Sequence, residues 1–141
     1  MLTEEWRIEA LRRFPTLAER LQDAETPYLL WFELRDAFEC AYRTPRNEDM
    51  IKNIYGYSEW CFSQPAGKTA DDDLATCVSV CFIEHIPEIP AAVEDMPRWF
   101  TRANILEMKE ILSYHAGADG YKKILVCFNH YHKDKKKQKR K

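Results

Sequence analysis

The chain has 141 residues, of which 45% are hydrophobic and 31% charged, and its formal net charge is −2. A chain of this length suits one domain, which buries roughly 70% of the surface that it exposes when unfolded. No apolar run approaches the ~20 residues of a membrane-spanning helix, and the acidic N-terminus is unlike a signal peptide. We therefore expect a single cytoplasmic domain over residues 1–132, without a membrane span.

The charges are distributed unevenly along the chain. Residues 132–141 hold 7 Lys/Arg and 1 Asp, a net of +6, whereas the rest holds 14 Lys/Arg and 22 Asp/Glu, a net of −8. Because like charges repel and nothing apolar anchors them, we expect residues 133–141 to form a disordered basic tail. If this tail contacts nucleic acid through phosphate charge, the candidate residues are Lys135, Lys136, Lys137, Lys139, Arg140 and Lys141.

Apolar residues at helical spacing predict several helices in the first half of the chain. One helix ends at Pro15 and is followed by a short piece through Leu21. Thr26 and then Pro27 are a typical helix start, which predicts a helix over residues 27–43. A third helix follows Asn47, and its predicted inner face is Ile51, Ile54, Tyr55, Ser58, Cys61 and Phe62.

The stretch 71–90 is the one around which we expect the interior to form. Its apolar residues predict a buried helix over residues 72–85, with Leu74, Val78, Cys81, Phe82 and His85 on one face. The three aspartates at 71–73 can cap that helix, and Pro87 ends it because proline lacks the amide donor. His85 is then expected to close the inner face of the helix with one hydrogen bond.

The remaining residues also read as helical. Three prolines within 87–97 predict a turn and a short helix near 91–95. The next helix begins at Thr101 or Asn104, carries His115 on its apolar face, and ends at Gly117 and Gly120.

Segment 121–131 fits a strand or a helix, and we predict a helix because a lone strand leaves its backbone groups unpaired. The expected fold is all-α: a single compact multi-helix bundle or irregular helical array around the central buried helix.

The patterns that carry chemistry are weak in this sequence. The five cysteines are expected to be buried, reduced thiols. Cys127, His130 and His132 have metal-ligand spacing, but on a helix His132 is turned well away from His130. Glu84 and His85 point about 100° apart on a helix and form no dyad by themselves. We therefore expect no catalytic residues, no metal and no cofactor.

Three stretches together resemble a known family: YSEW at 57–60, CFIEHIP at 81–87 and DMPRWF at 95–100. The family is one of small bacterial, all-helical domains of unknown function, and the resemblance covers residues 27–128. It implies the fold, and it carries no catalytic residue over to this chain. Some members of such families look like immunity proteins, which bind and block a toxin.

Three functions remain open at this point. The first is a non-enzymatic protein-binding module, an immunity-type inhibitor of a basic toxin being one form, because the net −8 body suits a basic partner. Its candidate contact residues are Glu48, Asp49, Lys68, Asp71 and Asp72. The first alternative is a nucleic-acid-associated accessory protein acting through the tail, and the second is an enzyme with a site near His85 or His115. The partner's identity and the oligomeric state stay open.

Overall fold

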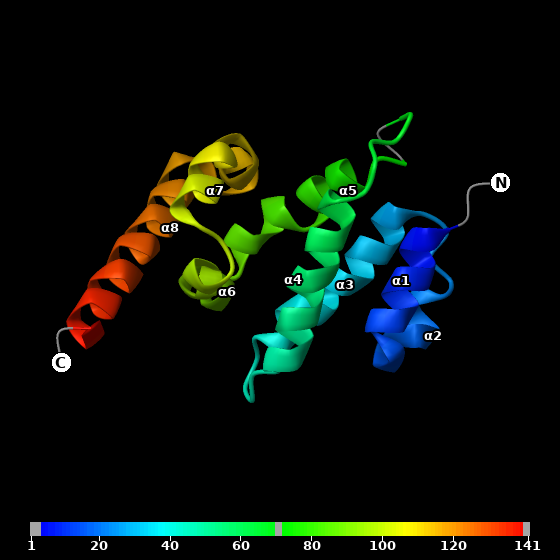
Figure 1. The fold of residues 1–141 in the computed structure, drawn as a ribbon, viewed down its shortest axis with the longest axis horizontal. Coiled ribbons are helices and arrows are strands. Elements are labelled where there is room, and N and C mark those ends of the chain that lie inside the picture. The colour runs from blue at the N-terminus through cyan, green and yellow to red at the C-terminus, as the bar shows by residue number, and fades with distance from the viewer. Residues whose placement is uncertain (1–3, 70–71, 140–141) are drawn as a thin grey trace. The chain divides into compact units, whose positions relative to one another are not determined.

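The computed structural model describes residues 4–69 and 72–139, with side chains up to residue 131 (Figure 1). Within these residues every regular element is helical and no strand occurs, which confirms the predicted all-α class. Segment 121–131 is helical, as predicted. The chain divides into two compact units, Met1–Phe82 and Ile83–Lys141, and each is described by itself. The expected single domain therefore stays a prediction.

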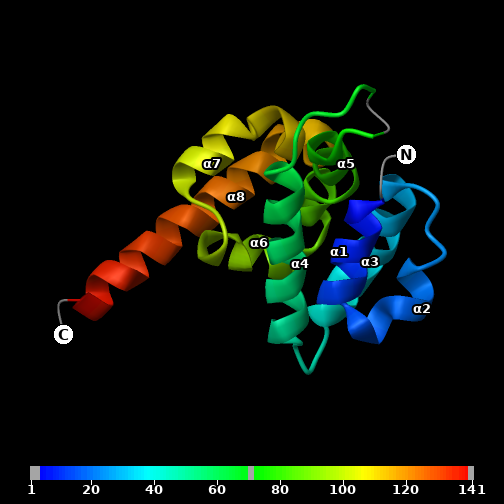
Figure 2. The same cartoon turned by 45° about the vertical axis from the view of Figure 1, so that its right-hand side comes forward.

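Unit 1 begins with three short elements and continues with three longer helices. In chain order they are α1 (Glu5–Arg13), the 3₁₀ helix η1 (Pro15–Leu17), α2 (Ala18–Leu21), α3 (Pro27–Ala41), α4 (Glu48–Phe62) and α5 (Leu74–Cys81). The helices α1, α3 and α4 run side by side in Figure 1 and in Figure 2. Three of the starts are capped by side chains: Thr26, Asn47 and Asp73 each accept a hydrogen bond from a backbone amide three residues on.

An aromatic cluster fills the space between α3, α4 and α5. The ring of Phe82 stacks on Trp31 with centroids 5.1 Å apart, and Phe38 meets Phe82 edge-on at 4.8 Å. Val78 and Phe82 are 0% and 1% exposed. The mid-chain segment is thus buried as predicted, and the cluster gains both burial and ring-edge attraction.

A hydrogen bond from Tyr57 joins α4 to α1, although Tyr57 was not among the residues predicted for the inner face of α4. The hydroxyl of Tyr57 donates to the carbonyl oxygen of Trp6 at 2.7 Å, and burial raises the pKa of Tyr57. Gly56 lies at the same crossing, where a Cβ would come within 3.0 Å of Nη1 of Arg13. Phe62 was expected on the inner face, but it is 43% exposed because the last turn of α4 runs into the loop beyond the core.

Unit 2 is built from short elements that pack against one long helix. These are the 3₁₀ helix η2 (Ile83–Glu88), α6 (Pro90–Asp95), the 3₁₀ helix η3 (Met96–Arg98), α7 (Arg102–Glu107) and α8 (Lys109–Lys139). Thr101 and Asn104 form a reciprocal capping box at the start of α7. The hydroxyl of Tyr121 in α8 donates to the carbonyl oxygen of Ile105 in α7 at 3.1 Å. The short helix predicted near 91–95 is confirmed by α6.

The predicted helix over residues 72–85 is wrong beyond Cys81. The α-helix ends at Cys81, and residues 83–88 form the 3₁₀ helix η2, with Pro87 inside it. The ring of Pro87 would clash with the carbonyl of Ile83 in an α-helix, so the chain tightens to the 3₁₀ form before it. The prediction placed His85 on one helical face with Val78 and Cys81. In the structure His85 lies on η2 and does not share that face.

Helix α8 is bent at Gly117, as expected of the glycine predicted to end a helix there. Gly117 has φ 72° and ψ −178°, and the helix resumes beyond it. Gly120 permits the bend, because a Cβ there would lie 2.5 Å from Cβ of Ala116. The predicted helix end at Gly117 is thus confirmed: two helical segments meet at this non-helical residue, and α8 includes both.

The helix α8 continues through residues that the sequence predicts to be a disordered tail. Its backbone is helical to Lys139, and its last part extends beyond the other elements of unit 2 (Figures 1 and 2). The side chains of residues 132–139 and all of 140–141 lie outside the described residues.

No single helix in the described part of the chain is long and apolar enough to cross a membrane. The segments Leu74–Glu88 and Pro90–Arg98 reach that length and apolarity only as a pair, with a sharp bend between them. Core helices that are buried within a protein meet the same criterion, and Cys77, Val78 and Ile86 of this pair are buried.

Replacing Gly117 with alanine should destabilise unit 2 by about 1–3 kcal/mol, because its φ and ψ lie in a region that is open essentially to glycine alone. No atom lies within 4 Å of the Cβ that alanine would add, so the cost is backbone strain and not a clash. Urea unfolding followed by circular dichroism measures this loss. An equal stability for Gly117→Ala would show that α8 is straight in solution.

Asp73 should make the stability of unit 1 depend on pH. Its pKa is lowered by hydrogen bonds from the Thr76 hydroxyl and the Gly67 amide, so its folded-state pKa lies below the ordinary 3.8. A lowered pKa stabilises the fold above the unfolded-state pKa, and the effect disappears as the pH falls through the folded-state value. Asn caps helices as well as Asp does, so Asp73→Asn keeps the cap without the charge. The stability difference between wild type and Asp73→Asn should persist at pH 7, begin to fall at about pH 4 and vanish only below the folded-state pKa of Asp73; a constant difference would contradict the assignment.

Candidate functional site

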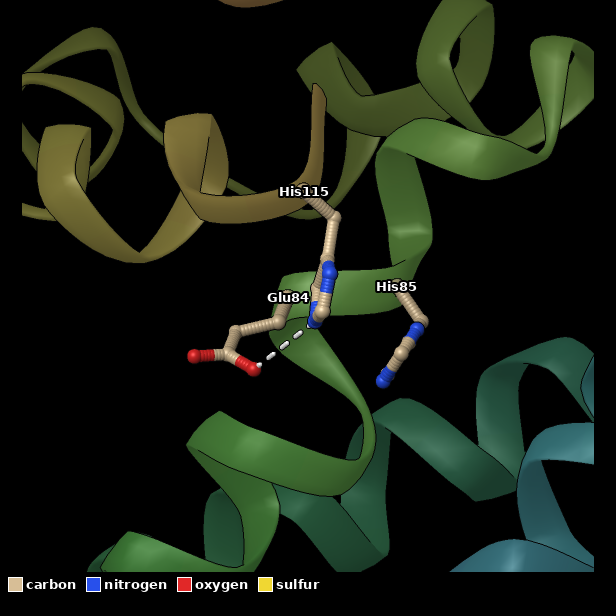
Figure 3. Close-up of side chains that lie close together, drawn as sticks. All are labelled: Glu84, His85 and His115. Atoms are coloured by element: carbon tan, nitrogen blue, oxygen red, sulfur yellow. Dashed lines mark ion pairs between the residues drawn. The ribbon is translucent and has the colours of Figure 1, made fainter. Parts of the chain in front are cut away.

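Three side chains that can bind a metal or exchange a proton come together in unit 2. They are Glu84 and His85 from η2 and His115 from α8 (Figure 3). One ligand atom from each lies within 4.8 Å of the other two. In the part of the chain that the structure describes, no other group of three His, Cys, Asp or Glu residues meets this criterion.

The 3₁₀ geometry of η2 decides where its side chains lie. In a 3₁₀ helix the side chains at i and i+3 eclipse, so residues 83–88 form three pairs. Ile83 and Ile86 form the buried pair, each 1% exposed. His85 and Glu88 form another, and Nδ1 of His85 lies 3.2 Å from Oε2 of Glu88. The tight helix therefore anchors one stripe in the core and presents His85 with a carboxylate beside it.

His115 reaches the same place from the last turn of α8 before the Gly117 kink. Its Nε2 lies 3.4 Å from Oε2 of Glu84. Its ring stacks on that of His85, with centroids 4.7 Å apart and planes 24° from parallel. One turn earlier, Leu112 is fully buried and fixes this face of α8 against the core of unit 2.

The three side chains of the cluster are partly buried, and His115 is the most exposed of them. The side chains of Glu84, His85 and His115 are 14%, 20% and 37% exposed. The ring of Tyr114, which is 73% exposed, meets His115 edge-on at 4.8 Å. A small ion or water can therefore reach the histidines from solvent, while the carboxylate of Glu84 is mostly screened from it.

Sequence reasoning identified His85 and His115 singly but missed their meeting. The expectation that Glu84 and His85 form no dyad by themselves assumed an α-helix, whereas both lie on the 3₁₀ helix η2 and Glu84 pairs with His115. Glu88 was not considered, although Pro87 carried the signal: a proline that forces a 3₁₀ turn places residues three apart on one side. The sequence also offered Cys127, His130 and His132 as metal ligands by their spacing. Cys127 is half-buried and His130 is exposed, and His132 has no described side chain.

The residues predicted to contact a protein partner do not form one surface. Glu48 and Asp49 are exposed in the first turn of α4, and Glu48 lies 3.7 Å from Arg46. Lys68 and Asp72 lie in the loop after α4, at the other end of a helix about 20 Å long. Asp71 lies outside the described residues. The acids at 71–73 were expected to act alike, but Asp73 caps α5 while Asp72 accepts from the amide and hydroxyl of Thr69.

Lys68 and Asp72 border a recess in unit 1 that the sequence did not reveal. Its volume is about 380 Å³, and it is lined mainly by apolar side chains, including Trp6 of α1, Trp60 of α4 and Leu74 of α5. Trp60 is held in place by stacking on Tyr57, with centroids 5.7 Å apart. The recess is therefore a mainly apolar surface whose charged lining residues are Glu5, Lys68 and Asp72.

The cysteines are distributed differently from the prediction in one respect. Cys61, Cys77 and Cys81 are buried as expected, whereas Cys40 is exposed and Cys127 is intermediate. Cys40 follows the buried Phe38 by two residues, which turns it to the outer side of α3. Burial raises the pKa of the Cys61 thiol to about 12, so this thiol is protonated at neutral pH and is a poor nucleophile.

Comparison with protein-family models, with characterised proteins and with solved structures finds no match for this chain. The resemblance drawn from the sequence thus stays a prediction.

Proposed function

We propose that this chain is a protein-binding module whose acidic unit 1 takes a basic protein partner. The observation that carries the proposal is the recess lined by Trp6, Trp60 and Leu74. A half-exposed aromatic hollow with charged groups at its edge is the usual form of an interface centre, where one partner side chain inserts. A toxin neutralised by an immunity protein is one class of such a partner.

Charge complementarity selects a basic partner. Residues 1–82 hold 9 Lys/Arg and 15 Asp/Glu, a net of −6, so unit 1 carries most of the acidity of the body. Glu5 and Asp72 are exposed at the recess and Lys68 is the basic residue that lines it. Opposite charge speeds the encounter and excludes acidic competitors, while the aromatic floor supplies the affinity.

Selection of peptides by the full-length protein tests this proposal without knowledge of the partner. Twelve-residue random peptides displayed on phage should enrich for sequences with several Lys/Arg and one large apolar residue. The enriched peptides should bind at least about tenfold more weakly to Trp60→Ala, because a central aromatic is worth about 2 kcal/mol or more.

The matched control is Phe62→Ala, since Phe62 is an exposed aromatic on the same helix that does not line the recess. Its affinity for the enriched peptides should equal that of the wild type. Enrichment without basic residues, or equal binding to Trp60→Ala and Phe62→Ala, would contradict a basic partner at this recess.

A second function rests on the net charge of +6 over residues 132–141. A cluster of this charge binds nucleic-acid phosphates and releases their counterions, with an affinity that falls steeply as salt increases. Deleting residues 133–141 should abolish retention on duplex DNA or RNA at low salt. Retention that is unchanged by the deletion would exclude the tail as the contact. An enzyme centred on His85 stays a prediction.

A further inference from the structure

We propose that Glu84, His85 and His115 bind a divalent transition-metal ion, with zinc the best fit. This site is independent of the recess in unit 1, and it goes against our sequence-based expectation of no metal. Two imidazole nitrogens and one carboxylate oxygen are the donor set of three-ligand zinc sites that keep a fourth position open to water.

The distances between donors suit such an ion. Zinc bonds of about 2.0–2.1 Å at tetrahedral angles place ligand atoms about 3.4 Å apart. Nε2 of His115 and Oε2 of Glu84 already lie 3.4 Å apart, and no donor atom in the group is more than 4.8 Å from the others. Figure 3 shows the three side chains converging on one small region.

Glu88 supplies the second layer that a metal-bound histidine requires. Metal-bound histidines usually donate their other ring N–H to a carboxylate, which fixes the tautomer and the ring orientation. Glu88 lies 3.2 Å from Nδ1 of His85, so the proton is held at Nδ1 and Nε2 keeps its lone pair for the metal. The eclipsed side chains of η2 therefore place a ligand and its supporting carboxylate side by side.

The alternative role of the same residues is an ion pair between Glu84 and a protonated His115. That pair needs neither His85 nor Glu88, whereas the metal site needs His85 as a ligand and is strengthened by Glu88. The ion pair also predicts that the unfolding temperature does not depend on zinc. The two roles therefore differ in what each variant does to zinc affinity.

Isothermal titration of the untagged full-length chain with zinc chloride tests the proposal. We expect one zinc ion per chain and a higher unfolding temperature, because a ligand at 100 times its Kd raises the folded-to-unfolded ratio about 100-fold. Magnesium, which prefers oxygen ligands and octahedral geometry, should do neither. Failure of zinc to bind, or to raise the unfolding temperature, would overturn the proposal.

Variants locate the ion. His115→Ala should abolish the stoichiometric zinc binding, and Glu88→Gln, which keeps all three ligands, should weaken it about 10–100-fold. The matched control replaces both C-terminal histidines, His130→Ala with His132→Ala, and should bind zinc as the wild type does. Circular dichroism of each metal-free variant shows whether it has folded, and His85→Gln replaces His115→Ala if that variant does not fold. Zinc binding that survives loss of a ligand histidine, or that disappears with His130 and His132, would overturn the site.

Discussion

Replacing Phe82 with alanine should lower the free energy of unfolding of unit 1 by about 3–5 kcal/mol. Phe82 is 1% exposed and contacts three rings: Trp31, Phe38 and Tyr55. Alanine would leave a cavity that these large side chains cannot close, so the loss includes both the transfer of the ring and the missing contacts. Urea unfolding, followed by tryptophan fluorescence, measures it.

Phe32→Ala is the matched control for this substitution. Phe32 neighbours Trp31 in α3, but it is 46% exposed and its ring faces the guanidinium of Arg35. Its removal should change the free energy of unfolding by about 0.5–1 kcal/mol, because it loses only a surface cation–π contact. Equal losses for the two substitutions would show that the interior of unit 1 does not form around Phe82.

The second large effect is expected at Asp95 in unit 2. Its carboxylate is 6% exposed and accepts hydrogen bonds from Nη1 of Arg98 at 2.9 Å and Nε1 of Trp99 at 3.0 Å. Asp95→Ala should cost about 2–4 kcal/mol, because it removes a charged acceptor from two donors and leaves the indole N–H without this partner. Unfolding measured by circular dichroism gives the loss.

Asp95→Asn separates the hydrogen bonds from the charge. Asn keeps one acceptor oxygen for Trp99, so Asp95→Asn should lower the free energy of unfolding clearly less than Asp95→Ala does. Arg98→Ala should cost less still, since the arginine side chain is 42% exposed and its charge is solvated. If Asp95→Ala and Arg98→Ala cost the same, the salt bridge and not the buried acceptor network stabilises this turn.

Local chemistry explains which parts of this fold the sequence predicts well. Thr26 and Asn47 mark helix starts that the structure reproduces, because a capping hydroxyl or amide acts on its own next residues. The burial of Val78 and Cys81 followed from a spacing that only one helical face satisfies. Such features depend only on residues nearby in the sequence, so the sequence of a single protein is enough to predict them.

The predictions that failed concern features that depend on distant parts of the chain or on the choice between an α-helix and a 3₁₀ helix. Pro87 was expected to stop the helix after His85, but the chain changes to 3₁₀ geometry four residues earlier and redirects His85. The meeting of His85 with His115 joins residues 30 positions apart through the packing of α8 on η2. No periodicity within either segment encodes that pairing, so the candidate site was not predictable from spacing.

The histidine ring resonances, followed by NMR in the absence and presence of zinc, test the metal site most directly. Rings stacked at 4.7 Å should give cross-relaxation between His85 and His115, and zinc should shift both sets of resonances together while His130 keeps its position. Four histidines that show no mutual cross-relaxation, and that respond to zinc alike, would contradict the site and the packing of α8 on η2 that builds it.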